Sequence, residues 1–179
     1  MSIKNTTGKY GRGTQLLHGI IAILFIMQFA LVYSKQYVVS NDGTKLSLLM
    51  LHKSIGFSLL FIGLVFILWR CINTKPGYPK KMARWEVWLA NTNHRLLYLL
   101  AFIMPLTGVI MSMSSGKGIK WFGHPVPNLL AKNENLAGIF YNTHVYLSYL
   151  ILVLLFLHIA GSLKHHYIDK NNILQRMWR

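Results

Sequence analysis

The sequence predicts an all-α fold: an integral membrane four-helix bundle, formed by a single domain over residues 1–179, with both termini cytoplasmic. Two observations on composition support the membrane location. Hydrophobic residues make up 53% of the chain and charged residues only 13%, whereas a soluble domain carries about 25% charged residues. The mean hydropathy is +0.38, so the chain has more apolar surface than one small soluble core can bury.

The third observation is the length of the apolar segments, because about 20 mostly apolar residues cross a bilayer as one helix. Four segments reach this length, at residues 16–33, 46–69, 96–113 and 141–163. The first lacks a clear small-x-small cleavage site, so we expect a retained span rather than a signal peptide. The connections at 70–95 and 114–140 each contain two prolines, which prevent a helix from running through them.

The distribution of basic residues predicts the orientation. The N-terminus, the 70–95 connection and the C-terminus carry the larger share, namely Lys4, Lys9, Arg12, Arg70, Lys75, Lys80, Lys81, Arg84, Arg95, Lys164, Lys170, Arg176 and Arg179. The opposite side carries Lys35, Lys45, Lys53, Lys117, Lys120 and Lys132. The positive-inside rule therefore places both termini in the cytoplasm. Although the net charge is +15, the basic residues separate apolar runs instead of forming one stripe, so we expect no nucleic-acid partner.

Histidines are the candidate functional residues, since ionisable groups inside a membrane are costly and mark functional sites. The chain has eight histidines, and the four predicted spans contain no carboxylate. This argues against a carboxylate proton relay and against a carboxylate-rich metal site. Neutral imidazoles suit haem iron. The single cysteine, Cys71, excludes an intrachain disulfide and a Cys-rich zinc site.

The spacing of the histidines predicts two pairs. His144 and His158 are 14 residues apart on the fourth span, which is about 40° short of four helical turns, so they share a face about 21 Å apart in height. His18 begins the first span and lies on the inner side, whereas His52 begins the second span and lies on the outer side. Matching by depth pairs His18 with His158 and His52 with His144. We interpret the pairs as axial ligands of two haem b irons, one near each membrane face.

The alternative for any one of the four paired histidines, taken alone, is a hydrogen-bonded packing residue. The roles of the remaining histidines are open. His94 is a rival inner ligand, a quinone contact or an interfacial residue. His165 and His166 could form a solvated, basic helix end. The alternative is a functional role, as a contact to a haem propionate or in proton exchange with quinone. His124 follows Trp-Phe-Gly and precedes Pro, and we expect it to be a surface residue.

The chain resembles the bacterial cytochrome b561 family, in particular its small stand-alone members. The resemblance rests on four spans with these four histidines, followed by the tail G-S-L-K-H-H-Y-I-D-K-N-N-I-L-Q-R-M, and covers about Gly11 to Met177. It implies two b haems in a four-helix bundle of the bacterial inner membrane, with a ubiquinone-type quinone as electron acceptor. It also implies an outer-face electron donor, which is superoxide in the members that oxidise superoxide to oxygen. The family's ligands carry over to His18, His52, His144 and His158.

The expected function is therefore that of an oxidoreductase. Two histidines fill both axial positions of each iron, so outer-sphere electron transfer is favoured over oxygen activation. Lys53 adjoins His52 and is the candidate for guiding an anionic donor, or it pairs with a haem propionate. Lys45, Lys117, Lys120 and Lys132 complete a predicted positive funnel. His94, Arg95, His165 and His166 are the candidates for quinone or propionate contacts on the inner face.

Two alternatives remain open. The chain could be a cytochrome b subunit that relays electrons for a separate redox protein, which would dock on the 114–140 connection. It could also be a small transporter or a structural membrane protein with packing histidines. The lack of intramembrane acids and of broken helices argues against the transporter.

Overall fold

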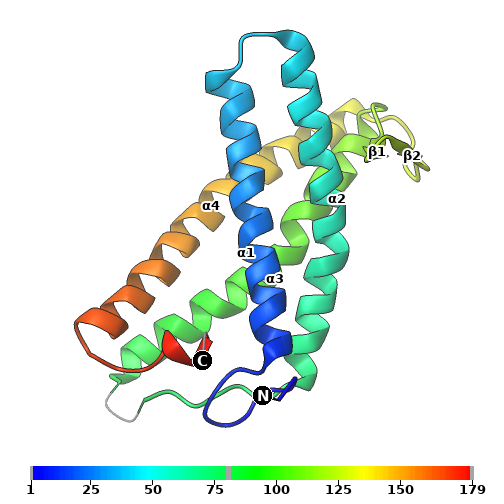
Figure 1. The fold of residues 1–179 in the computed structure, drawn as a ribbon. Helices are drawn as coiled ribbons and strands as arrows, with labels where there is room; N and C mark the ends of the chain where they lie inside the picture. The colour runs from blue at the N-terminus through cyan, green and yellow to red at the C-terminus, as the bar shows by residue number, and fades with distance from the viewer. Residues whose placement is uncertain (1, 80–81, 178–179) are drawn as a thin grey trace.

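The computed structural model describes residues 2–79 and 82–177. It contains four long helices, α1 (Arg12–Tyr33), α2 (Asp42–Ile72), α3 (Arg84–Ser114) and α4 (Glu134–Tyr167). Each is long and apolar enough to cross a membrane, which confirms the predicted fold class. In Figure 1, α1 and α2 lie side by side, and α3 and α4 pass them at an angle. The most extensive backbone contacts join helices that are consecutive in the chain.

The helices extend beyond the apolar spans into their polar flanks. Asn41 and Asn133 cap α2 and α4, because their side chains accept hydrogen bonds from the amides of Thr44 and Leu136, each at 3.0 Å. A π-helical turn, Ser34–Val38, continues α1 into the expected connection. The connection between the first two spans is therefore shorter than the apolar pattern predicts.

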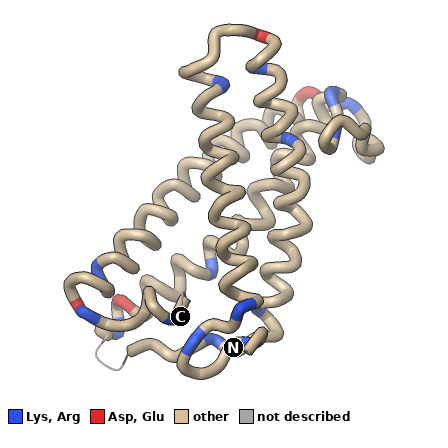
Figure 2. Tube along the Cα trace, viewed as in Figure 1, with Lys and Arg blue, Asp and Glu red and all other residues tan. Residues whose placement is uncertain are grey.

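Both termini lie at one end of the bundle, together with the connection between α2 and α3 (Figure 1). Backbone hydrogen bonds join these segments, from the Tyr10 amide to the Arg176 carbonyl at 3.3 Å and from the Gly77 amide to the Thr7 carbonyl at 3.1 Å. We call this the terminal end. Figure 2 shows many of the Lys and Arg residues there, as the sequence predicts, although Lys80, Lys81 and Arg179 lie outside the described residues. That this end faces the cytoplasm stays a prediction.

The opposite end, which we call the hairpin end, carries a two-stranded sheet that the sequence pattern does not predict. Strands β1 (Ile119–Trp121) and β2 (His124–Val126) are antiparallel. Phe122 and Gly123 connect them with φ angles of 47° and 94°, as in the tight type I′ turn. The Phe122 amide donates to the Ser54 hydroxyl at 3.0 Å, and Lys53 Nζ donates to the Gly118 carbonyl at 3.2 Å. The hairpin is thereby attached to α2.

The interior is small because most apolar side chains face outward. Leu100 of α3 packs with Ile151 and Leu154 of α4 in the buried core. Large apolar residues from every helix are exposed, among them Ile23, Ile26, Phe61, Leu68, Leu99, Val153, Phe156 and Ile159. In a bilayer these side chains contact lipid, which makes burial inside the protein unnecessary.

Candidate functional site

The fold brings the four span histidines together in two pairs. The ring centres of His18 and His158 are 6.1 Å apart, with an angle of 48° between the ring planes. Those of His52 and His144 are 6.2 Å apart, with the planes at 86°. His18 comes from α1, His52 from α2, and both partners from α4. We call them the terminal-end pair and the hairpin-end pair; the pairs are those that spacing and depth predict.

The separation within each pair fits two imidazoles on opposite sides of one metal ion. A metal–imidazole bond is about 2 Å long and the nitrogen lies roughly 1 Å from the ring centre, so the two centres would be about 6 Å apart. Rings in direct contact could pack closer than this. The residues present therefore suit a haem iron at each level of the bundle, and ligation itself stays a prediction.

Open space lies beside the hairpin-end pair. A cavity of about 300 Å³ is lined by all four helices, by the two histidines of the pair and by Ile119 of β1. Two glycines, Gly56 and Gly108, line this cavity, and neither has a side chain that would occupy the space. A Cβ at Gly108 would lie 3.0 Å from His144 Cε1, and one at Gly56 would lie 3.0 Å from Gln28 Nε2. A mostly apolar space next to two imidazoles suits a flat macrocycle.

The lysines of the predicted funnel differ in their contacts. Lys45 and Lys132 are paired with carboxylates, Asp42 at 3.6 Å and Glu134 at 2.9 Å. Their charges are therefore partly offset, and the funnel stays a prediction. Lys53 adjoins His52 and donates to the Gly118 carbonyl, so its ammonium is held by the hairpin. The predicted funnel did not include Lys35, a lysine of the predicted outer side that lines the cavity.

His94 lies beside the terminal-end pair. Its ring centre is 5.1 Å from that of His158, with the planes at 85°. Its Nδ1 lies 2.5 Å from the Ala90 carbonyl one turn earlier in α3, so that nitrogen donates and Nε2 carries the lone pair of the neutral ring. The 5.1 Å separation is shorter than the spacing expected across an iron. This favours a supporting position for His94 next to the pair.

Sequence reasoning missed a polar cluster near His94. Lys75 Nζ donates to the Tyr78 hydroxyl at 2.7 Å and also bonds to Asn91 Oδ1. Burial lowers the pKa of Lys75 to about 8, with further contributions from the charges of Arg70 and Arg95. The predicted site residue Arg95 is exposed on α3. No local signal marks this cluster, because Lys75 lies in a connection 16 residues from Asn91.

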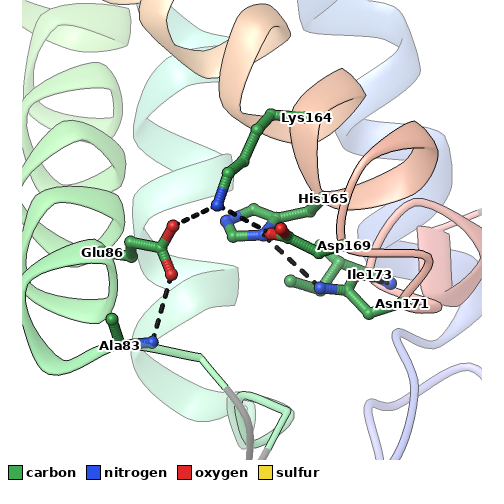
Figure 3. Close-up of polar contacts among 7 residues, drawn as sticks. All are labelled: Ala83, Glu86, Lys164, His165, Asp169, Asn171 and Ile173. Atoms are coloured by element: carbon green, nitrogen blue, oxygen red, sulfur yellow. Dashed lines mark hydrogen bonds and ion pairs between the residues drawn. The ribbon is translucent and has the colours of Figure 1, made fainter.

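The C-terminal end of α4 carries a second polar cluster (Figure 3). Lys164 bonds to Glu86 of α3 and lies 2.9 Å from Asp169 Oδ2. His165 Nδ1 lies 2.6 Å from the same oxygen, and His165 is 9% exposed. The alternative of a solvated helix end is therefore wrong for His165. His166 Nδ1 is buried and has no hydrogen-bond partner among the described residues.

We expect the contacts of Asp169 to make the free energy of unfolding depend on pH in the acidic range. The Lys164 ammonium, and after it His165, hold the pKa of the Asp169 carboxyl below its usual range. Its stabilising contribution is therefore present above the unfolded-state pKa of about 3.9 and is lost as the pH falls through the folded-state pKa. Asp169→Asn should lower the thermal unfolding midpoint at about pH 7, and the difference from wild type should shrink toward about pH 3.

The control for this prediction is Asp42→Asn, because the Asp42 side chain is 98% exposed and 3.6 Å from its lysine. We expect almost no change in the control, as for most exposed ion pairs. An Asp169→Asn difference of equal size at both pH values would contradict the prediction.

Comparison with known proteins shows the family of the chain. The family model described as prokaryotic cytochrome b561 matches residues 9–179. Cytochrome b561 homolog 2 of Escherichia coli (strain K12) is 36% identical over 179 residues, covering 99% of this chain and 95% of the relative. The probable superoxide oxidase CybB of Yersinia pestis is 26% identical, covering 90% of both chains. Cytochrome b561 homolog 1 of Escherichia coli (strain K12) is 23% identical, covering 90% of this chain and 92% of the relative.

Four apolar helices with paired histidines between them suit a membrane electron-transfer protein of the b-cytochrome class. The chain belongs to the prokaryotic cytochrome b561 family, which confirms the resemblance seen in the sequence. Membership in this family implies that the protein binds haem b.

Proposed function

We propose that residues 1–179 form one di-haem b oxidoreductase domain that passes electrons across the bacterial inner membrane, from an outer-face donor to quinone. The observation that carries the proposal is the presence of two histidine pairs with ring centres 6.1 and 6.2 Å apart. Their separation along α4, about 21 Å from the 14-residue spacing, spans most of a hydrocarbon core. The terminal end faces the cytoplasm and the hairpin end faces outward in this proposal.

The four histidines would hold the cofactors. His52 and His144 would ligate the outer haem, and His18 and His158 the inner haem. Bound haem supplies reversible one-electron transfer at the iron. With both histidines of a pair engaged, the protein would offer no further position for oxygen to bind iron, which would favour electron transfer without iron–oxygen bonding.

The donor best supported is superoxide. It is a small anion, and Lys35, Lys53, Lys117 and Lys120 lie at the hairpin end, where their positive potential raises the encounter rate. One relative of this chain is named a probable superoxide oxidase. Two superoxide ions each lose one electron and become oxygen. One quinone takes up these two electrons with two protons and becomes quinol.

The quinone would bind at the terminal end. His94 is next to the inner histidine pair, and Arg95, His165 and His166 complete the candidates for quinone or propionate contacts. His165 is hydrogen-bonded to Asp169 at 2.6 Å, so a polar path made of these two side chains lies at the terminal end. Such a path suits the proton uptake that quinone reduction requires.

The test is rapid mixing of the purified protein with superoxide, with and without ubiquinone. We expect haem reduction faster than the spontaneous dismutation of superoxide, and quinol formation when ubiquinone is present. Lys53→Gln should slow the reaction and reduce its dependence on ionic strength, because it removes a positive charge next to His52. Haem reduction no faster than dismutation would exclude superoxide as the donor.

A second candidate function is that of a cytochrome b subunit for a separate redox protein. The observation that favours it is the apolar surface at the hairpin end, where Trp121, Phe122 and Leu129 are 46%, 57% and 80% exposed. Exposed aromatic residues are typical of protein interfaces. A redox protein that co-purifies in a one-to-one ratio, together with slow reduction by superoxide, would favour this function.

A further inference from the structure

The imidazole of His144 is in contact with two neighbouring residues of α3 that the proposed function does not use. The Thr107 hydroxyl oxygen lies 2.9 Å from His144 Nδ1 and 2.7 Å from the Met104 carbonyl oxygen. Thr107 is 4% exposed, so bulk water does not compete for these bonds. Gly108 faces the same ring, because a Cβ there would lie 3.0 Å from His144 Cε1 and 3.4 Å from Nδ1.

The direction of the two hydrogen bonds follows from counting protons. A carbonyl oxygen only accepts hydrogen bonds, and the Thr107 hydroxyl has a single proton. The hydroxyl donates its hydrogen bond to the Met104 carbonyl. In the bond between Thr107 and His144, the donor is therefore Nδ1–H and the acceptor is the hydroxyl oxygen. A neutral imidazole has one N–H, and Nε2 of His144 therefore keeps the lone pair that a metal ion needs.

His52, the other member of the hairpin-end pair, lacks such support. Its Nδ1 is buried and has no hydrogen-bond partner within residues 2–79 and 82–177. The nearby Gln28 contacts the backbone instead, since its Nε2 donates to the His52 carbonyl at 3.1 Å. The two histidines of this pair thus differ, and α3 sets the tautomer of His144.

We propose that Thr107 is a positioning residue for the hairpin-end haem, an inference that rests on the haem ligation proposed above. Its hydroxyl selects the His144 tautomer with the proton on Nδ1 and leaves Nε2 free to ligate iron. The hydrogen bond that the hydroxyl oxygen accepts from Nδ1–H also makes the imidazole a stronger electron donor, which stabilises oxidised over reduced iron. Thr107 therefore lowers the midpoint potential of this haem and strengthens its retention.

The test is a redox titration of Thr107→Val and Thr107→Ser. Valine keeps the branched shape but removes the hydroxyl, so we expect a more positive midpoint potential at the hairpin-end haem and about 10- to 100-fold weaker haem binding there. Serine keeps the hydroxyl and should titrate like the wild type. The terminal-end haem of the same molecule is an internal reference, and its potential should not move.

A matched control is Thr143→Val, because the Thr143 hydroxyl donates to the Ile139 carbonyl of its own helix at 2.9 Å. His52→Ala, which should lack the hairpin-end haem, identifies the redox component that belongs to that site. If Thr107→Val does not fold, Thr107→Ala provides the same test without a β-branched side chain.

The outcomes separate this inference from the function on which it rests. A folded Thr107→Val or Thr107→Ala protein with wild-type potentials and wild-type haem retention overturns the role of Thr107. A wild-type protein that binds no haem, or a His144→Ala variant that keeps two haems, overturns the haem assignment itself.

Discussion

Replacement of His52 or His158 by alanine should remove one haem per chain, and a different haem in each variant. Each histidine belongs to one pair, with ring centres 6.2 Å apart at the hairpin end and 6.1 Å apart at the terminal end. A b haem has no covalent attachment to the chain, so loss of one axial ligand weakens its retention directly. The measurement is the ratio of haem to purified protein, from reduced-minus-oxidised spectra, together with the redox component that remains.

Two further variants sharpen this experiment. His124→Ala is the matched control, because His124 lies exposed in β2, and it should keep both haems. His94→Ala should also keep both if His18 is the ligand opposite His158. The pairing is contradicted if His52→Ala and His158→Ala lose the same haem, or if His94→Ala rather than His18→Ala loses the inner one.

Substitution of Gly63 by alanine should strongly destabilise the bundle. Gly63 of α2 lies against the backbone of α3, where a Cβ would contact the Ala101 carbonyl oxygen, lie 2.9 Å from its carbonyl carbon and 3.3 Å from the Phe102 amide nitrogen. These backbone atoms cannot move aside as a flexible side chain can, so α2 and α3 must separate. Overpacking of this kind costs about 1–3 kcal/mol. The measurement is thermal unfolding of the detergent-solubilised protein.

The matched control is Gly138→Ala in α4. A Cβ at Gly138 has nothing within 4 Å, so we expect unchanged or slightly higher stability, since alanine favours the helix over glycine. Equal unfolding midpoints for wild type and Gly63→Ala would show that α2 and α3 are not packed this closely.

The histidine pairs illustrate how much of the site could be predicted. Their proximity follows from two local rules, the 3.6-residue helical period along α4 and the alternation of direction between successive spans. Neither rule depends on how the helices tilt or rotate. For that reason the predicted partners, His18 with His158 and His52 with His144, are the ones that the structure brings together.

Other parts of the site could not be predicted in this way. The Lys75 contact with Asn91 joins a connection to a helix, and the Lys164 contact with Glu86 joins residues 78 positions apart. The hairpin strands have three residues each, which is too short for a recognisable alternation of polar and apolar side chains. Nothing in the sequence distinguishes Thr107 from other threonines in membrane spans, because its role follows only from its distance to His144.

The sequence by itself determined the four membrane helices, the concentration of positive charge at the terminal end and the choice of histidine partners. These properties depend on hydrophobicity, charge and helical period, which are summed over many residues or repeat along one segment. Only the tertiary structure decided which hydroxyl bonds to His144, which carboxylates pair with Lys164 and where α2 approaches α3 most closely. Such contacts depend on the rotation and separation of packed helices to within about an ångström, and single-residue patterns do not encode that information.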